Sequence, residues 1–151
     1  MYKQPRSVQV VIFADDSGSR RYLLLHRIES HGGFWQSVTG SLEPGETAIQ
    51  AALRETKEET GISALVARLI DLRITNVFKI APQWLPRFPP GTVYNEEVCF
   101  ALAAPESEIV LDHREHDDYM WAGYNESMEL VYWESTRRAL AATNLLRDVI
   151  R

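Results

Sequence analysis

The sequence predicts an α+β domain in which helices pack on a mixed β-sheet. Strand-like runs rich in Val, Ile and Leu alternate with helical segments along the chain, in the order 7–14, 21–27, 47–60, 64–80, 92–103 and 132–150, where 47–60 and 132–150 are the helices. With 151 residues, 45% of them hydrophobic, the chain is long enough to bury one core. We therefore expect a single domain over residues 1–151.

Turn residues separate these elements. The first two strands flank "DDSGSR", which predicts a hairpin. A glycine-rich loop follows, with a short strand at Gln36–Val38. The segment 64–80 is one long strand or two short ones, and 81–91 holds four of the seven prolines and is expected to be a loop. The run "EIVL" at 108–111 is a candidate for a further strand.

Charge and cysteine content exclude several classes of protein. The net charge is −5 and there is no basic block, which argues against nucleic-acid binding. No apolar run is long enough to cross a membrane. Cys99 is the only cysteine and lies in an apolar run, so we expect a buried, inert thiol and a cytoplasmic protein. The four histidines lack the spacing of a zinc site.

The helix at 47–60 carries the strongest signal in the sequence. Thr47 and Gln50 have the spacing of a capping box, and Gly61 is placed to end the helix. The 3.6-residue period puts Glu55, Glu58 and Glu59 within one arc beside the apolar face. The apolar arc of Ala48, Ile49, Ala52, Leu53, Thr56 and Thr60 is expected to face the sheet, and Gln50, Arg54 and Lys57 to face solvent.

Like charges at this spacing weaken a helix unless a cation compensates them. A solvated acidic stripe is the alternative. Mg²⁺ prefers hard oxygen ligands of this kind, so the spacing favours a divalent metal site.

The pattern from Gly40 to Ile62, "GSLEPGETAIQAALRETKEETGI", resembles the Nudix box, G-x5-E-x7-R-E-U-x-E-E-x-G-U. Thr56 departs from it, since the family usually has an aliphatic residue there. The resemblance implies an α/β/α sandwich and metal-dependent cleavage of a phosphoanhydride. By this resemblance, the expected ligands of Mg²⁺, or of Mn²⁺ in its place, are Glu55, Glu58 and Glu59. The Gly40 carbonyl is a further ligand, Glu46 joins through water, and Arg54 orients the loop or a glutamate.

Residues outside the box complete the expected site. Glu55 or Glu58 is a candidate proton acceptor, and Glu115, in the acidic loop "DHREHDDYMW" at 112–121, is expected to be a ligand or the base. Arg27 and Lys3 are candidates for phosphate contacts, and Trp35 and Gln36 for contacts with a flat ring. Glu96 and Glu97 begin a strand, and alternation turns only one of these carboxylates inward.

Segments spread from Tyr2 to about Trp121 are also similar to the bacterial Nudix diphosphatases that act on dihydroneopterin triphosphate, which were described as dATP pyrophosphohydrolases too. This implies a small-molecule triphosphate substrate, with dihydroneopterin monophosphate and pyrophosphate as products in folate synthesis. The alternatives are a broader diphosphatase of (d)NTPs or dinucleoside polyphosphates, and a non-catalytic nucleotide-binding module of the same fold. Monomer and homodimer both stay open.

Overall fold

The computed structural model describes residues 1–147. The strands are β1 (Arg6–Asp16), β2 (Ser19–Arg27), β3 (Trp35–Gln36), β4 (Val38–Ser41), β5 (Leu69–Lys79), β6 (Tyr94–Ala103) and β7 (His116–Ala122). The α-helices are α1 (Ala48–Thr60), α2 (Tyr124–Leu130) and α3 (Glu134–Asn144). Short 3-10 helices, η1 (Glu29–His31), η2 (Val66–Arg68) and η3 (Pro82–Arg87), lie in the connections.

The seven strands form one mixed sheet, as predicted. Its order is β3-β2-β1-β6-β5, with β4 paired to β1 and β7 paired to β2. The pairing of β1 with β6 is parallel, and the other pairings are antiparallel. Because β1 pairs with β2 near their shared turn and with β4 at its other end, β1 and β2 separate beyond the turn.

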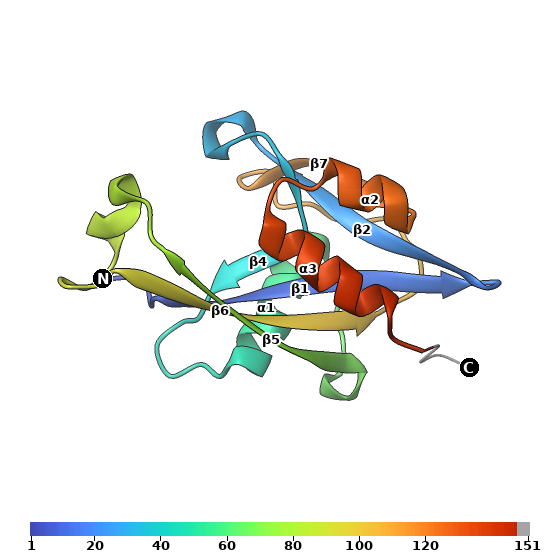
Figure 1. The fold of residues 1–151 in the computed structure, drawn as a ribbon, viewed down its shortest axis with the longest axis horizontal. Coiled ribbons are helices and arrows are strands. Elements are labelled where there is room, and N and C mark those ends of the chain that lie inside the picture. Colours follow the sequence, from blue (N-terminus) through green and yellow to red (C-terminus); the bar gives the residue numbers. More distant parts are fainter. Residues whose placement is uncertain (148–151) are drawn as a thin grey trace.

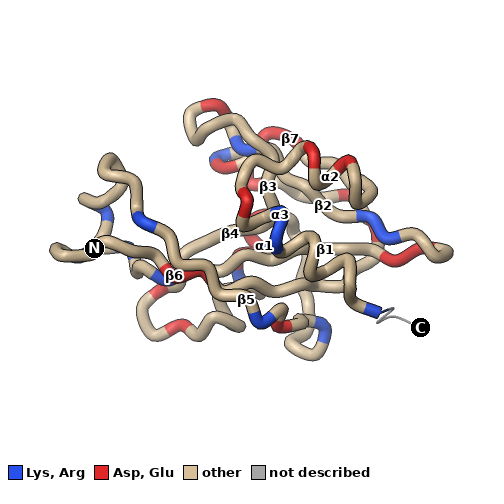
Figure 2. Tube along the Cα trace, viewed as in Figure 1, with Lys and Arg blue, Asp and Glu red and all other residues tan. Residues whose placement is uncertain are grey.

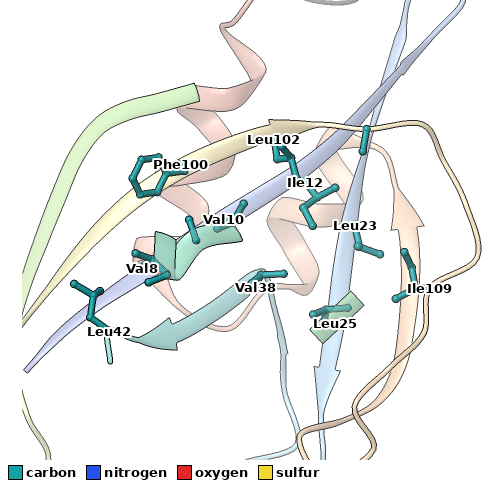
Figure 3. Packing of buried hydrophobic residues seen from close by; sticks show 13 residues of the cluster. Val8, Val10, Ile12, Leu23, Leu25, Val38, Leu42, Phe100, Leu102 and Ile109 are labelled. Carbon is teal, nitrogen blue, oxygen red and sulfur yellow. The ribbon is translucent and has the colours of Figure 1, made fainter. Parts of the chain in front are cut away.

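Helices cover both faces of this sheet (Figure 1). One core cluster lies between the sheet and α1 and includes Val8, Val10, Phe100 and Ala52 (Figure 3). The other contains Val11, Cys99 and Leu140 and lies under α2 and α3. The expected α/β/α sandwich is therefore confirmed. No helix within residues 1–147 is long and apolar enough to span a membrane.

The predicted hairpin of β1 and β2 is confirmed. Asp16 pairs with Ser19, which leaves a loop of Ser17 and Gly18. Both loop residues have positive φ, 51° and 81°. This is the backbone of the two-residue turn that matches the twist of antiparallel strands.

Helix α1 begins and ends where the sequence predicted. The Thr47 hydroxyl accepts from the Gln50 amide at 3.1 Å, and the Gln50 side chain accepts from the Thr47 amide at 2.9 Å. Gly61 ends the helix with φ of 80°. The predicted apolar arc was partly wrong, because Ile49 is 42% exposed whereas Ala51 and Glu59 are buried. The helix thus turns one of its carboxylates towards the sheet.

The segment between β6 and the C-terminus differs most from the prediction. Residues 108–111 form no strand. The strand in this part of the chain is β7, which begins inside the segment 112–121 that was expected to be an acidic loop. A short helix, α2, precedes α3, and the helix predicted at 132–150 is α3, with residues 148–150 outside the described part. The segment 64–80 is one long strand after η2, and the proline-rich segment 81–91 contains η3.

Candidate active site

The carboxylates of α1 meet the sheet at β4. Gly40 in β4 pairs with Val8 of β1, and the Glu55 side chain lies directly against the Gly40 backbone. A Cβ atom at Gly40 would lie 2.0 Å from Cδ of Glu55. Any larger residue at position 40 would therefore displace the Glu55 carboxylate, which occupies the space of its side chain.

Arg54 binds the carboxylates around it. Its Nε and NH2 atoms donate to Glu46 at 2.7 and 2.9 Å, and its NH1 atom donates to Glu55 at 2.8 Å and Glu58 at 3.2 Å. NH2 also donates to the Ser41 carbonyl at 3.0 Å. Arg54 was predicted to face solvent, but its guanidinium folds back over the box. It joins the loop after β4 to the helix.

Glu46 and Glu58 differ in how firmly they are held. Both Glu46 oxygens are bound by Arg54, and the Glu43 amide donates to Oε1 at 2.8 Å. The Arg54 guanidinium holds the pKa of Glu46 below its usual range. The Glu58 side chain is 53% exposed and has the single contact with Arg54. Glu58 is thus the freer of the two carboxylates.

Glu59 is the most buried carboxylate of the site. The residue is 6% exposed, and its Oε1 atom has no hydrogen-bond partner. Burial, and then the charge of Glu55, raise the pKa of Glu59 well above its usual value. Burial also raises the pKa of Glu55. Two adjacent buried carboxyl groups with raised pKa values favour either a bound proton or a cation between them.

The donor set fits a divalent cation. It offers an unpaired buried carboxylate oxygen on Glu59, the Glu55 carboxylate against the Gly40 backbone, and the exposed Glu58. All are hard oxygen donors of the kind that Mg²⁺ and Mn²⁺ take. In this conformation, no three histidine, cysteine or acidic residues within 1–147 are close enough together to hold a metal ion. The carboxylates of the box pair with Arg54.

Glu115 lies in the turn before β7 and faces Arg27. Its Oε2 atom is 3.6 Å from NH1 of Arg27 and 3.4 Å from Nδ1 of His31, and its side chain is 40% exposed. Its charge contributes to the raised pKa of Glu59, so it is close to the box. The Nε atom of Arg27 is buried without a partner. Arg27 therefore keeps one unsatisfied donor, and its guanidinium places a positive charge beside Glu115.

Lys3 approaches the same group from the N-terminal segment. Its backbone amide donates to the Arg87 carbonyl at 2.7 Å. Burial, and then the Arg87 charge, lower the pKa of Lys3, whereas the charges of Glu115 and Glu55 raise it. The structure thus brings Lys3, Arg27, Glu55 and Glu115 together from separate parts of the chain.

Trp35 and Gln36 do not act together, because neighbouring residues of a strand face opposite sides. Trp35 packs on the core under α2 and α3, with its ring 5.0 Å from that of His26. Gln36 is 2% exposed, and its Nε2 atom lies 3.2 Å from Nε2 of His116. Burial lowers the pKa of His116 to about 4, so the ring is neutral at pH 7. No local pattern in the sequence predicted this contact, because Gln36 and His116 lie on separate strands.

Charge over the rest of the molecule agrees with a local site. Lys and Arg are spread over separate elements in Figure 2 and form no basic stripe in this view. The predicted buried thiol is confirmed, since Cys99 is free and buried and burial raises its pKa to about 12.

The fold and the box define a class of protein. The NUDIX domain model matches residues 3–143, and the chain belongs to this family. It is 43% identical over 143 residues to the dihydroneopterin triphosphate diphosphatase of Escherichia coli strain K12, covering 93% of this chain and 92% of that one. The solved E. coli dihydroneopterin triphosphate pyrophosphohydrolase superimposes with a TM-score of 0.78, over 93% of this chain and 94% of that one.

Two further relatives are similar over most of the chain. The Haemophilus influenzae dihydroneopterin triphosphate diphosphatase is 33% identical, over 92% of this chain and 87% of that one. The mouse bis(5'-nucleosyl)-tetraphosphatase is 31% identical, over 83% of this chain and 79% of that one.

Proposed function

We propose that this chain is a divalent-metal-dependent diphosphatase that hydrolyses dihydroneopterin triphosphate to dihydroneopterin monophosphate and pyrophosphate. The substrate comes from the 43% identity, over nearly the whole chain, to an enzyme named for it. The observation that carries the chemistry is the buried, unpaired oxygen of Glu59 beside Glu55, which suits a cation. Mg²⁺ is the proposed metal and Mn²⁺ a substitute.

Glu55, Glu58 and Glu59 would hold the ion, with the Gly40 carbonyl as a further donor. Such an ion would neutralise polyphosphate charge and would supply a bound water of lowered pKa. Arg54 positions Glu55 and Glu58 and keeps the loop after β4 against the helix. Because Glu46 is fully engaged by Arg54 and the Glu43 amide, its role is to hold Arg54.

Glu115 is the proposed proton acceptor. Its side chain is partly exposed, and its contacts with Arg27 and His31 are long, so it can accept a proton from water without first breaking a short hydrogen bond. Glu58 is the alternative acceptor, since it too is exposed. Arg27 and Lys3 supply positive charge beside these carboxylates and would bind the phosphates.

The test is initial-rate hydrolysis of freshly made 7,8-dihydroneopterin triphosphate, dATP, other dNTPs and diadenosine tetraphosphate, with Mg²⁺ and with chelator. We expect the highest kcat/KM for the pterin and no turnover with chelator. Glu55→Gln should abolish turnover, and Glu126→Gln, an exposed residue in α2, should leave it unchanged. A higher kcat/KM for diadenosine tetraphosphate would favour the function of the mouse relative, and no turnover of any compound would favour a binding module.

A further inference from the structure

An arginine of the proline-rich segment 81–91 lies next to the candidate active site. Helix η3 ends at Arg87, and the Arg87 carbonyl accepts a hydrogen bond from the Lys3 amide at 2.7 Å. Figure 1 shows the yellow-green segment that contains η3 beside the marked N-terminus. The Pro5 carbonyl accepts from the Glu96 amide at 3.0 Å, so the N-terminal segment is also fixed to the start of β6. The side chains of Lys3 and Arg87 therefore start from adjacent backbone.

The Trp84 ring supports the Arg87 guanidinium. The ring centroid lies 4.7 Å from Cζ of Arg87, which is a cation–π contact. A 3-10 helix has three residues per turn, so side chains three positions apart lie one above the other. Pro82 and Pro86 restrict the backbone of η3, and Phe88, directly after it, is buried. The guanidinium is therefore held over one ring, while the N–H donors at its edge stay available.

Lys3 and Arg87 have no carboxylate partner in the part of the chain that the structure describes. Arg27, a third cation close to Lys3, lies 3.6 Å from Glu115, which is longer than a hydrogen bond. Burial, and then the charge of Arg87, lower the pKa of Lys3, so the two cations repel each other. Such repulsion costs free energy unless an anion lies beside the like charges. Three cations thus gather at one point of a chain whose net charge is −5, an arrangement that suits an anionic ligand.

The same cations border the carboxylates of the site. The charges of Glu115 and Glu55 raise the pKa of Lys3, so both carboxylates are close to it. Lys3 and Arg87 are exposed, and a ligand can reach them from solvent. The leaving group of the proposed reaction is pyrophosphate, which contains the outer phosphates and most of the negative charge. Guanidinium and ammonium groups bind phosphate oxygens through charge-assisted hydrogen bonds. A triphosphate at the α1 carboxylates can therefore extend its outer phosphates to Lys3 and Arg87.

We propose that Arg87, positioned by Trp84, acts with Lys3 as the subsite for the outermost phosphate, and that this subsite selects triphosphates over diphosphates. The inference rests on the proposed function, which places the reacting phosphates at the α1 carboxylates. A diphosphate lacks the outermost phosphate and leaves the subsite empty. Because the subsite contacts no ring, it accepts dihydroneopterin triphosphate and dATP alike. Arg87 and Lys3 therefore recognise the number of phosphates.

The test compares kcat/KM for dATP and dADP at saturating Mg²⁺ between the wild type and Arg87→Gln, with dihydroneopterin triphosphate measured alongside. Wild type should prefer dATP over dADP by about 10-fold or more, because only dATP supplies an acceptor for both cations. In Arg87→Gln the value for dATP should fall much more than the value for dADP, so that the preference drops about 10-fold. If dADP binds without being hydrolysed, its inhibition constant against dATP takes the place of its kcat/KM.

The matched control is Arg68→Gln, because Arg68 is an exposed arginine that ends η2 as Arg87 ends η3. This variant should keep the wild-type preference. Trp84→Phe retains a ring under Arg87 and should keep more of the preference than Trp84→Leu does. An equal loss on dATP and dADP in Arg87→Gln, or no preference in wild type, would overturn the proposal. If Arg87→Gln does not fold, Lys3→Gln decides by the same ratio.

The experiment separates this inference from the proposed function. Turnover of dATP without turnover of the pterin would reject the proposed substrate, while the ratio of dATP to dADP would still test Arg87. If no compound is hydrolysed, calorimetric titration with inorganic tripolyphosphate and Mg²⁺ replaces kinetics. Weaker binding to Arg87→Gln than to Arg68→Gln supports the subsite, and equal binding overturns it.

Discussion

Replacing Gly40 by alanine should lower the activity of the protein by displacing Glu55. The new Cβ atom would lie 2.0 Å from Cδ and 2.3 Å from Oε1 of Glu55. Carbon atoms pack at about 3.5 Å, so the carboxylate or the β4 backbone has to move by roughly 1.5 Å. A displacement of that size at a catalytic group costs about 100-fold in rate. Overpacking of this kind costs about 1–3 kcal/mol of stability.

The assay is kcat/KM for dihydroneopterin triphosphate at saturating Mg²⁺, with the unfolding free energy measured by urea denaturation. Gly123→Ala is the matched control, since a Cβ atom at Gly123 meets nothing within 4 Å. That variant should keep wild-type kcat/KM. A Gly40→Ala protein with wild-type kcat/KM would show that the position of Glu55 against β4 has no part in the reaction.

Three further predictions concern α1. Thr47→Ala removes the capping box and should lower stability by about 1 kcal/mol in urea denaturation, with Thr75→Ala, on the exposed side of β5, as the comparison. Because the pKa of Glu59 is raised in the folded state, metal-free protein should lose stability as pH rises above the unfolded value of 4.5. Glu59→Gln should make the urea unfolding free energy less dependent on pH above 4.5, and an unchanged pH slope would contradict the assigned burial cost. Arg54→Lys cannot bridge three carboxylates, so kcat should fall at saturating Mg²⁺; unaltered kcat would reject the positioning role.

The elements that the sequence predicted well are those with local signals. The cap of α1, its end at Gly61 and the β1–β2 turn each depend on residues a few positions apart. Strand β7 was missed because Asp117 and Asp118 near its start are exposed, which is typical of a loop. Strand β7 pairs with β2, which lies far away in the sequence, and a local sequence pattern cannot predict such a pairing.

The site was predictable to the extent that it lies within one helix. Helical periodicity placed Glu55, Glu58 and Glu59 together, but it favoured Ile49 as a buried residue over Glu59. Helical periodicity predicts burial from hydrophobicity, so it cannot predict a carboxylate that is buried beside a second carboxylate. The contacts of Gln36 with His116, and of Gln9 and Asn76 with Glu97, join separate strands and emerge only from the fold.

A competition reaction tests the central claim most directly. Equal concentrations of 7,8-dihydroneopterin triphosphate and dATP are mixed with the protein and Mg²⁺, and the loss of both is followed in one vessel by chromatography. The relative rates then give the ratio of the two kcat/KM values. We expect the pterin to be consumed first, to dihydroneopterin monophosphate and pyrophosphate, and neither compound to react with chelator present. Faster loss of dATP, or pterin cleavage that persists with chelator, would contradict the account.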